Sequence, residues 1–345
     1  MKKILITGGC GFIGSNLAIF LKKKKYKVYS LDNLSRKGSS LNFKRLKKFK
    51  IRNYRIDITN TEKVSKLPKF DIILDCCALV EANVKKENIK NVLSINFFGT
   101  NNLLMKCVKD KSKIIFFSTS RVYSIKSIYH LILNKKNLTK KINIKNKYLI
   151  NEKFDMSAPL SFYGLSKKFS EDLIKEYSYT FGIKYLINRF GVISGPWQFG
   201  KVEQGFLSLW LWKHLTKKKL YYKGFGGKGF QIRDILHIDD LCEVIYLQIN
   251  KLNRINNQIF NIGGGKNNSI DLKSLTDLSQ NITKNKIHIK NVKSTDISDI
   301  PIYISNNNKI IKYYKWKPTK KIKEIVTDVY KWQLKNLNTL RNFMK

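Results

Sequence analysis

Acidic residues, cysteines and long apolar runs are all scarce in this sequence of 345 residues. The five cysteines are odd in number and form no Cys-x-x-Cys, which excludes a disulfide framework and a tetrahedral zinc site. No apolar run approaches the roughly 18 to 20 residues that span a bilayer, and Met1-Lys2-Lys3 leads into a strand-like segment rather than a signal peptide. We therefore expect a cytoplasmic protein with reduced thiols and no membrane span.

The shortage of acids leaves 24 acidic against 67 basic residues, a formal net charge of +43. Such a charge attracts polyanions without regard to their sequence. The lysines are spread along the whole chain, however, and no recognisable nucleic-acid-binding motif accompanies them. We therefore expect a solvated basic surface and no specific nucleic-acid partner. The hydrophobic fraction of 43% excludes an intrinsically disordered chain.

Strand-like and helix-like segments alternate through the first part of the chain, which predicts an α/β fold with a doubly wound parallel sheet. The expected strands are Lys3–Thr7, Lys27–Leu31, Ile51–Ile56, Asp71–Asp75, Lys113–Phe117 and Lys184–Asn188. The expected helices are Phe12–Lys23, Thr61–Leu67, Lys90–Lys109 and Phe162–Phe181. Residues 124–153 are rich in Lys and Asn and have weak periodicity, so we expect a surface insertion there.

A glycine-rich turn follows the first expected strand and opens the first expected helix. Gly8, Gly11 and Gly14 are spaced Gly-x-x-Gly-x-x-Gly, and Gly9 adds a Gly-x-Gly-x-x-Gly. Such glycines let the backbone approach a pyrophosphate, and the helix N-terminus offers it unpaired N–H groups. Asp32 ends the second strand, where a carboxylate can accept hydrogen bonds from an adenosine ribose. This combination predicts a bound dinucleotide.

The residues after the second and third strands bear on which dinucleotide binds. Asp32 repels a 2′-phosphate, which favours NAD over NADP. The segment Ser35–Lys37 could hold that phosphate if Asp32 points away, so NADP stays a minor alternative. Asp57 and Ile58 follow the third strand, where the adenine edge is expected, although a simple turn explains them as well. We predict a Rossmann-like, NAD-binding domain over residues 1–194.

The remaining residues, 195–345, begin with glycine- and aromatic-rich loops and have shorter mixed elements. This change in composition and in element length predicts a smaller α/β region that is mainly substrate-binding. The chain could cross back once between the two regions.

Tyr163 and Lys167 are four residues apart and therefore lie on one face of an expected helix. A free phenol is a poor base at neutral pH, whereas a nearby ammonium stabilises the phenolate and lowers its pKa. The pair can thus move a proton. Thr119 follows the fifth strand at the carboxyl edge of the sheet, where doubly wound folds bind their ligands. These three residues are the expected catalytic set.

Several motifs together resemble the extended short-chain dehydrogenase/reductase family, and within it the nucleotide-sugar epimerases and dehydratases. They are TGGCGFIGSN, Asp32-Asn33, Ser118-Thr119, Tyr123, YGLSK and Gly195-Pro196. Finer features resemble the CDP-tyvelose/CDP-paratose 2-epimerases most closely: DNLSRKG from Asp32, Asn151-Glu152, Gln198-Phe199, Glu203-Gln204-Gly205 and QIRDILH from Gln231. The similarity covers nearly the whole chain.

The resemblance implies a role for each matching residue. Tyr163 would act as the acid and base at a sugar hydroxyl, Lys167 would orient NAD, and Thr119 would hydrogen-bond the reacting oxygen. The implied cofactor-binding residues are Gly8, Gly11, Phe12, Ile13, Gly14, Asp32, Asn33, Asp57, Ile58, Asn96, Tyr163 and Lys167. The implied substrate-binding residues are Thr119, Gln204 and Arg233, with Arg233 facing the diphosphate.

The resemblance also implies a reaction, which is transient oxidation and re-reduction at one carbon of a nucleotide sugar, C2 of a CDP-3,6-dideoxyhexose. Dehydratases of the family carry an Asp-Glu pair after the Thr, whereas Ser120-Arg121 stand here, so elimination lacks its acids. Three other positions depart from the family pattern. Asp75 replaces a usual His, Val192 a usual Asn or Ser, and Asp296 a usual Arg.

Two other functions fit the same residues. One is a 4-epimerase of another nucleotide sugar, such as a UDP-hexose. The other is a dinucleotide-sensing regulator without catalysis, for which an intact Thr119, Tyr163 and Lys167 set would have no use. The histidines show no ligand spacing, so we expect no metal. The family resemblance implies a homodimer or homotetramer.

Overall fold

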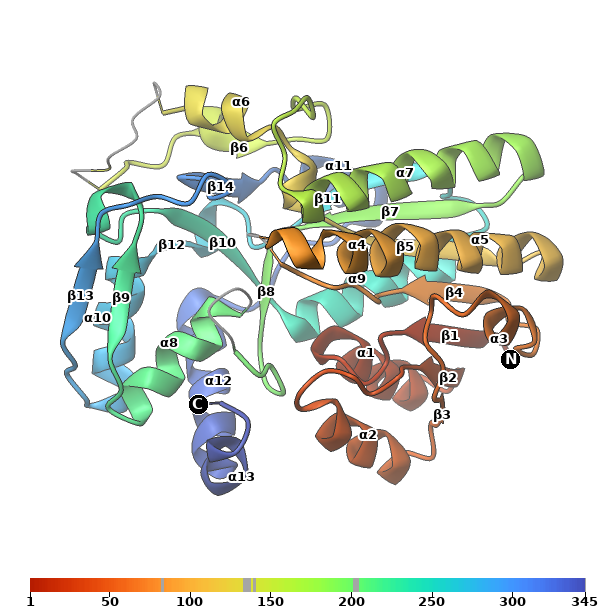
Figure 1. The fold of residues 1–345 in the computed structure, drawn as a ribbon, viewed down its shortest axis with the longest axis horizontal. Coiled ribbons are helices and arrows are strands. Elements are labelled where there is room, and N and C mark those ends of the chain that lie inside the picture. Colours follow the sequence, from red (N-terminus) through yellow and green to blue (C-terminus); the bar gives the residue numbers. More distant parts are fainter. Residues whose placement is uncertain (82–83, 133–137, 139–140, 201–204, 345) are drawn as a thin grey trace. The chain divides into compact units, whose positions relative to one another are not determined.

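The computed structural model describes residues 1–81, 84–132, 138, 141–200 and 205–344 (Figure 1). Their contacts divide the chain into two compact units. The first unit is Met1–Val122, Phe162–Arg189 and Cys242–Phe260, and the second is Tyr123–Ser161, Phe190–Leu241 and Asn261–Lys345. The prediction placed a boundary after residue 194 and allowed the chain to cross back once. The chain crosses several times because each unit's sheet includes strands from distant parts of the sequence.

The first unit is built on a seven-stranded sheet of order β11-β7-β5-β4-β1-β2-β3. The strands are β1 (Lys3–Thr7), β2 (Lys27–Leu31), β3 (Arg52–Tyr54), β4 (Ile72–Asp75), β5 (Lys113–Thr119), β7 (Tyr185–Phe190) and β11 (Gln258–Ile262). β1 pairs in parallel with both β2 and β4, β2 with β3, and β4 with β5. The strand order reverses direction between β1 and β4, which confirms the predicted doubly wound fold.

Helices of the first unit pack on this sheet in two groups. The helices are α1 (Phe12–Lys23), α2 (Ser39–Lys48), α3 (Thr61–Ser65), η1 (Lys86–Asn88), α4 (Ile89–Leu93), α5 (Gly99–Asp110), η3 (Ser120–Val122), α7 (Phe162–Phe181) and α9 (Ile238–Lys251). α5 contacts α3 and α7, whereas α1 contacts α9 through the rings of Phe20 and Tyr246. The predicted helix Lys90–Lys109 is divided by a π-helical turn, η2 (Ser94–Phe98), and α2 was not predicted.

One row of side chains crosses the middle of this sheet and bears on the site. Thr7 of β1 is registered with Asp75 of β4, and Asp75 with Phe116 of β5. Residues in register point to the same face of a sheet, and so do residues two apart along a strand. Ile73 and Phe116 belong to one apolar core with Ile174 of α7. The row therefore lies on the face that α7 covers.

The second unit contains a five-stranded sheet of order β12-β10-β14-β6, with β8 also paired to β10. Its strands are β6 (Leu149–Ile150), β8 (Val192–Ser194), β10 (Ile232–His237), β12 (Ser269–Asp271) and β14 (Ile302–Ser305). β9 (Leu220–Lys223) and β13 (Ile289–Val292) form a separate parallel pair. The helices are α6 (Ile125–His130), η4 (Asn146–Tyr148), α8 (Phe206–Leu215), η5 (Phe225–Gly227), η6 (Lys266–Asn268), α10 (Leu272–Thr283), α11 (Asn308–Tyr314), α12 (Ile322–Lys335) and α13 (Leu337–Arg341).

The core of the second unit lies among α8, α10 and α12. Leu211, Leu275 and Val329 of these helices are fully buried in one apolar cluster with Ile235 of β10. The unit is not the smaller region that we predicted, since it takes up as much of the chain as the first. None of the helices in the described ranges is long and apolar enough to cross a membrane.

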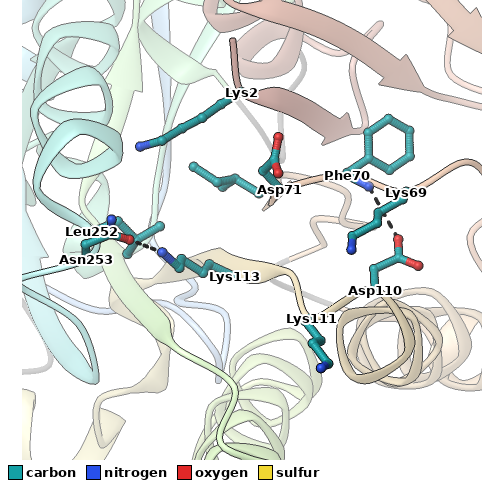
Figure 2. A pocket seen from close by; sticks show the side chains of 10 residues that line it. Lys2, Lys69, Phe70, Asp71, Asp110, Lys111, Lys113, Leu252 and Asn253 are labelled. Carbon is teal, nitrogen blue, oxygen red and sulfur yellow. Dashed lines mark hydrogen bonds between the residues drawn. The ribbon is translucent and has the colours of Figure 1, made fainter.

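A hollow of about 270 Å³ lies at the amino edge of the seven-stranded sheet (Figure 2). Its lining includes four lysines, Lys2, Lys69, Lys111 and Lys113, together with Asp71 at the start of β4. Figure 2 shows the ammonium of Lys113 bonded to the amide oxygen of Asn253. The lysines of the hollow lie near the starts of strands, whereas the glycine turn follows the end of β1. The hollow and the glycine turn are therefore at opposite ends of the sheet.

Candidate active site

The glycine turn between β1 and α1 packs against the residues that follow β4. Gly8 has a φ of +59°, and a Cβ there would lie 3.0 Å from the Cα of Cys77. The N–H of Gly11 donates to the carbonyl of Gly8 over 2.9 Å. A Cβ on Gly14 would lie 2.3 Å from that same carbonyl oxygen. Any side chain at Gly8 or Gly14 would therefore open the turn.

The first turn of α1 is suited to an anion. Gly11 is its N-cap, and in the described part of the chain no side chain caps this end. The helical bonds begin with the N–H of Ser15 donating to Gly11, so the N–H groups of Phe12, Ile13 and Gly14 precede them. The first turn carries no acidic residue. These residues fit the pyrophosphate of NAD, which such helix ends bind.

Asp32 is tied to the glycine turn from the end of β2. Its Oδ2 accepts from the N–H of Cys10 over 3.0 Å, and its Oδ1 from the N–H of Leu34 over 2.8 Å. Burial raises the pKa of this carboxyl, while the two backbone hydrogen bonds and the charge of Arg36 oppose the rise. The carboxylate thus stands beside the turn, where it was predicted to meet an adenosine ribose.

Asn33 and Asp57 contact each other although they follow different strands. The amide of Asn33 donates to Asp57 Oδ2 over 2.7 Å. Thr59 donates to Asp57 Oδ1 through its hydroxyl over 2.6 Å and its N–H over 2.9 Å. Burial opposes ionisation, but these hydrogen bonds outweigh it and lower the pKa of Asp57. The structure therefore brings two of the predicted cofactor residues together.

Ile58 and Asn96 were also predicted to line the cofactor site. In the structure Ile58 packs against α5, and Asn96 forms hydrogen bonds within the protein. Ile58 is buried, and a Cβ on Gly99 of α5 would approach its Cγ2 to 2.7 Å. The Asn96 amide accepts from the N–H of Leu79 over 2.8 Å and donates to Ser166 Oγ over 3.0 Å. Asn96 thereby joins the loop after β4 to α7.

Thr119 and Tyr163, the pair of residues predicted to react, both lie in the first unit. Thr119 ends β5 and Tyr163 lies in the first turn of α7, and both are nearly buried. Burial raises the pKa of the phenol to about 12, and a hydrogen bond to Thr119 and the charges of Arg121 and Arg36 limit the rise. A Cβ on Gly164 would lie 2.1 Å from the carbonyl of Arg121, so only glycine lets α7 approach β5 this closely.

Lys167 lies one turn after Tyr163 and is 1% exposed. Its ammonium is 4.1 Å from the centroid of the Phe116 ring. None of the described residues accepts a hydrogen bond from its Nζ. A buried ammonium without an acceptor fits the hydroxyls of a nicotinamide ribose, which the resemblance assigns to this residue.

A buried charged network behind the reactive pair was not predicted. Ser118 Oγ donates to Glu171 Oε1 over 2.5 Å, and Arg189 Nη2 donates to Glu171 Oε2 over 2.6 Å. The side chains of Glu171 and Arg189 are at most 2% exposed. The network joins β5, α7 and β7. The one available signal was that Glu171 continues the four-residue spacing of Tyr163 and Lys167 along α7.

The predicted substrate-binding residue Arg233 lies in the second unit, on β10. Its Nη2 donates to Asp299 Oδ1 over 2.9 Å and to the carbonyl of Ile300 over 2.7 Å. Its Nη1 donates to its neighbour Ile232 over 2.8 Å. The guanidinium is therefore already bonded to a carboxylate and to backbone carbonyls. Gln204, also predicted to bind substrate, lies outside the described residues.

His237, at the end of β10, is hydrogen-bonded within the turn that follows the strand. Its Nδ1 accepts from the N–H of Asp239 over 3.1 Å, and burial lowers the pKa of the ring. Within the ranges that the structure covers, no three His, Cys, Asp or Glu side chains are grouped closely enough to hold a metal ion.

Comparisons with known proteins agree with this geometry. The sequence model of the NAD dependent epimerase/dehydratase family matches residues 4–263. The chain is 29% identical to the CDP-paratose 2-epimerase of Salmonella typhi, over 96% of this chain and 98% of that one. It is 25% identical to the UDP-glucuronate 4-epimerase of Thermodesulfobacterium geofontis, over 99% of each. The UDP-glucose 4-epimerase of Thermus thermophilus, solved with NAD, has the same fold, with a TM-score of 0.78, 20% identity and coverage of 96% and 98%.

Proposed function

Because the chain belongs to the NAD-dependent epimerase/dehydratase family, we propose that it inverts C2 of a CDP-3,6-dideoxyhexose. Its cofactor is NAD. The observation that carries the proposal is the hydrogen bond between Thr119 and Tyr163, with buried Lys167 one helical turn farther on. The match to a CDP-paratose 2-epimerase over nearly the full length of both chains supports the choice of sugar and nucleotide.

Each reactive residue has a task that its surroundings permit. NAD, when bound, supplies reversible hydride transfer at one sugar carbon. Tyr163 takes the proton of the adjacent sugar hydroxyl and later returns it, and Thr119 holds that oxygen by a hydrogen bond. Lys167 contributes a positive charge and hydrogen-bond donors to the ribose. Inversion requires that the sugar turn its opposite face toward the nicotinamide before the hydride would return to the same carbon.

The residues after Thr119 favour epimerisation over dehydration. Ser120 and Arg121 form the turn η3, and the N–H of Arg121 donates to Thr119 Oγ1 over 3.2 Å. Dehydratases of the family use an Asp-Glu pair there to remove a proton and water. Neither a serine nor an arginine can serve as that acid, since the arginine remains protonated at any working pH.

A 4-epimerase acting on a UDP-hexose is the second candidate. The full-length match to a UDP-glucuronate 4-epimerase supports it. The two functions use the same Thr119, Tyr163 and Lys167.

Incubation with a panel of nucleotide sugars tests the proposal. CDP-paratose and CDP-tyvelose should interconvert without accumulation of NADH, as followed by NMR of the sugar and by absorbance. Inversion of UDP-glucose or UDP-glucuronate alone would favour the second candidate. Inertness toward every sugar, combined with salt-sensitive DNA binding, would favour the regulator that the sequence left open.

We also propose a homodimer or homotetramer, which pairs copies of this chain through α5 and α7 of the first unit. Phe98 at the end of η2, Met105 of α5 and Phe169 of α7 are 56%, 49% and 43% exposed. The ring of Phe97 contacts those of both Phe98 and Phe169, so the exposed apolar groups are contiguous. We assign the reaction to the cytoplasm on the composition of the sequence.

A further inference from the structure

Asp75, at the carboxyl end of β4, is a completely buried carboxylate, 0% exposed. Its Oδ1 accepts from the Thr7 hydroxyl over 2.7 Å, and its Oδ2 from the Thr100 hydroxyl over 2.8 Å. Both donors are neutral. Burying a carboxylate is costly, and two neutral donors offset that cost less than a nearby positive charge does.

The strand register places the Lys167 ammonium beside Asp75. Asp75 is the direct partner of Phe116 across β4 and β5, and the ammonium lies 4.1 Å from the centroid of the Phe116 ring. Adjacent strands are about 4.8 Å apart, and registered side chains point to the same face. Thr100 reaches Asp75 from α5, which contacts α7, the helix of Lys167. The carboxylate and the ammonium are therefore neighbours on one face of the sheet.

We propose that Asp75 is the fixed counter-charge of Lys167, which holds this ammonium protonated and in place for the reaction. Asp75 is thus a positioning residue, because it acts through Lys167 and touches neither sugar nor cofactor in this role. The inference rests on the proposed function. It also explains why a carboxylate can stand at a position where the resembling family usually has histidine.

The other groups that face Lys167 do not replace Asp75. Burial lowers the pKa of Lys167, and Asp75 is the strongest of the charges that oppose this, ahead of Cys77, Cys76 and Glu171. Burial raises the pKa of both cysteine thiols, so they stay neutral at working pH. Glu171 is bonded to Arg189 and Ser118. Asp75 is therefore the one carboxylate among these groups without its own cationic partner.

The test is the pH dependence of kcat for the NAD-loaded Asp75→Asn enzyme. Activity that needs a protonated Lys167 falls as pH rises through the pKa of that group. Removing the carboxylate lowers this pKa, so the alkaline limb of the profile should move to lower pH by about one unit or more.

Two variants control for structural effects. Thr100→Val removes one hydrogen bond of Asp75 but keeps its charge, and Asp71→Asn removes an exposed carboxylate before the same strand. Both should keep the alkaline limb of the parent. A folded Asp75→Asn enzyme with an unmoved alkaline limb, or an equal displacement in Thr100→Val, would overturn the inference.

A second measurement does not depend on turnover. Urea unfolding of Asp75→Asn, Lys167→Met and the double variant should be non-additive, with the double variant more stable than the sum of the single losses predicts. Additive losses would contradict the pairing. If the parent enzyme inverts no sugar but the unfolding data are non-additive, the proposed function fails while the charge pair stands.

Discussion

The charged side chains at the carboxyl edge of the seven-stranded sheet are buried, whereas lysines at its amino edge are exposed to solvent. At the carboxyl edge, Asp75 and Lys167 are almost completely buried, and Thr119 is nearly so. At the amino edge, Lys69 and Lys111 border an open hollow and are exposed to solvent (Figure 2). A charge in water needs no partner, whereas a buried one must be matched by an opposite charge or by hydrogen bonds.

The two edges differ in how strictly each charged side chain must be matched by its neighbours. Burial and the charges of Lys184 and Lys2 lower the pKa of Lys113 at the amino edge, and the charge of Asp71 opposes this, so four lysines crowd around two carboxylates there. This crowding follows from the overall charge of +43. The carboxyl edge instead places single charges at fixed positions. We conclude that the basic composition describes the surface, and that buried charges occur both at the carboxyl edge and in the Lys106–Asp110 ion pair.

The largest expected effect comes from the phenol at the carboxyl edge. Tyr163→Phe should reduce kcat by about 10²- to 10⁴-fold, since a general acid–base group of this kind contributes that much. Burial opposes ionisation of this phenol by raising its pKa to about 12, which leaves it as a proton donor as well as an acceptor. Turnover assays measure the effect of the substitution.

Tyr177→Phe is the matched control, because Tyr177 lies on the same helix and bonds only to Asn101 in the described contacts. This variant should retain parental turnover. Sugar inversion by Tyr163→Phe at the parental rate would show that the carboxyl edge is not the reactive one.

The second largest effect is expected from removing one partner of the buried Glu171–Arg189 ion pair. Glu171→Gln leaves the Arg189 guanidinium without its counter-charge and should lower the free energy of unfolding by about 3–5 kcal/mol. The double variant Glu171→Leu/Arg189→Met should recover most of this stability, since both charges are then absent. Urea denaturation measures both. Glu176→Gln, an exposed change on the same helix, is the control.

A Glu171→Gln protein within about 1 kcal/mol of the parent would contradict this reading, because buried pairs lose more than that when one partner is removed. The buried ion pair would then contribute little to holding β5, α7 and β7 together.

The smallest effect is expected at the amino edge. Lys69→Gln and Lys111→Gln should each change the free energy of unfolding by no more than about 0.5 kcal/mol, because both side chains are exposed. Turnover should equal that of the parent. Loss of activity in either variant would show that the hollow takes part in function, and the comparison between the two edges would fail.

Much of the first unit's architecture followed from local patterns. Predictions of β1, β2, α1 and α7 matched the observed bounds, because each combines a clear hydrophobic period with glycine or strand-end signals. α2 was missed because its sequence, SSLNFKRLKK, is mostly polar and buries only Ser39, Asn42 and Leu46. The break in the helix after Leu93 was missed because a π-helical turn leaves the hydrophobic pattern nearly unchanged.

The candidate site was predicted in part. Thr119, Tyr163 and Lys167 could be grouped from spacing and resemblance, and the structure brings them together. Asp75 was noticed only as a departure from a family pattern. Its importance depends on which strands are adjacent, and a sequence does not state that β1, β4 and β5 lie side by side.

The amino-acid sequence by itself determined the nucleotide-binding turn, the Tyr-x-x-x-Lys spacing and the alternation of strands and helices. These features depend on residues that are close along the chain, where backbone geometry fixes the spacing. Only the tertiary structure decided the division into two units, the bond of Arg233 to Asp299, and the register of Asp75 with Phe116, whose ring the Lys167 ammonium covers. Those contacts join residues far apart in sequence, and it is the burial of a common core that selects them.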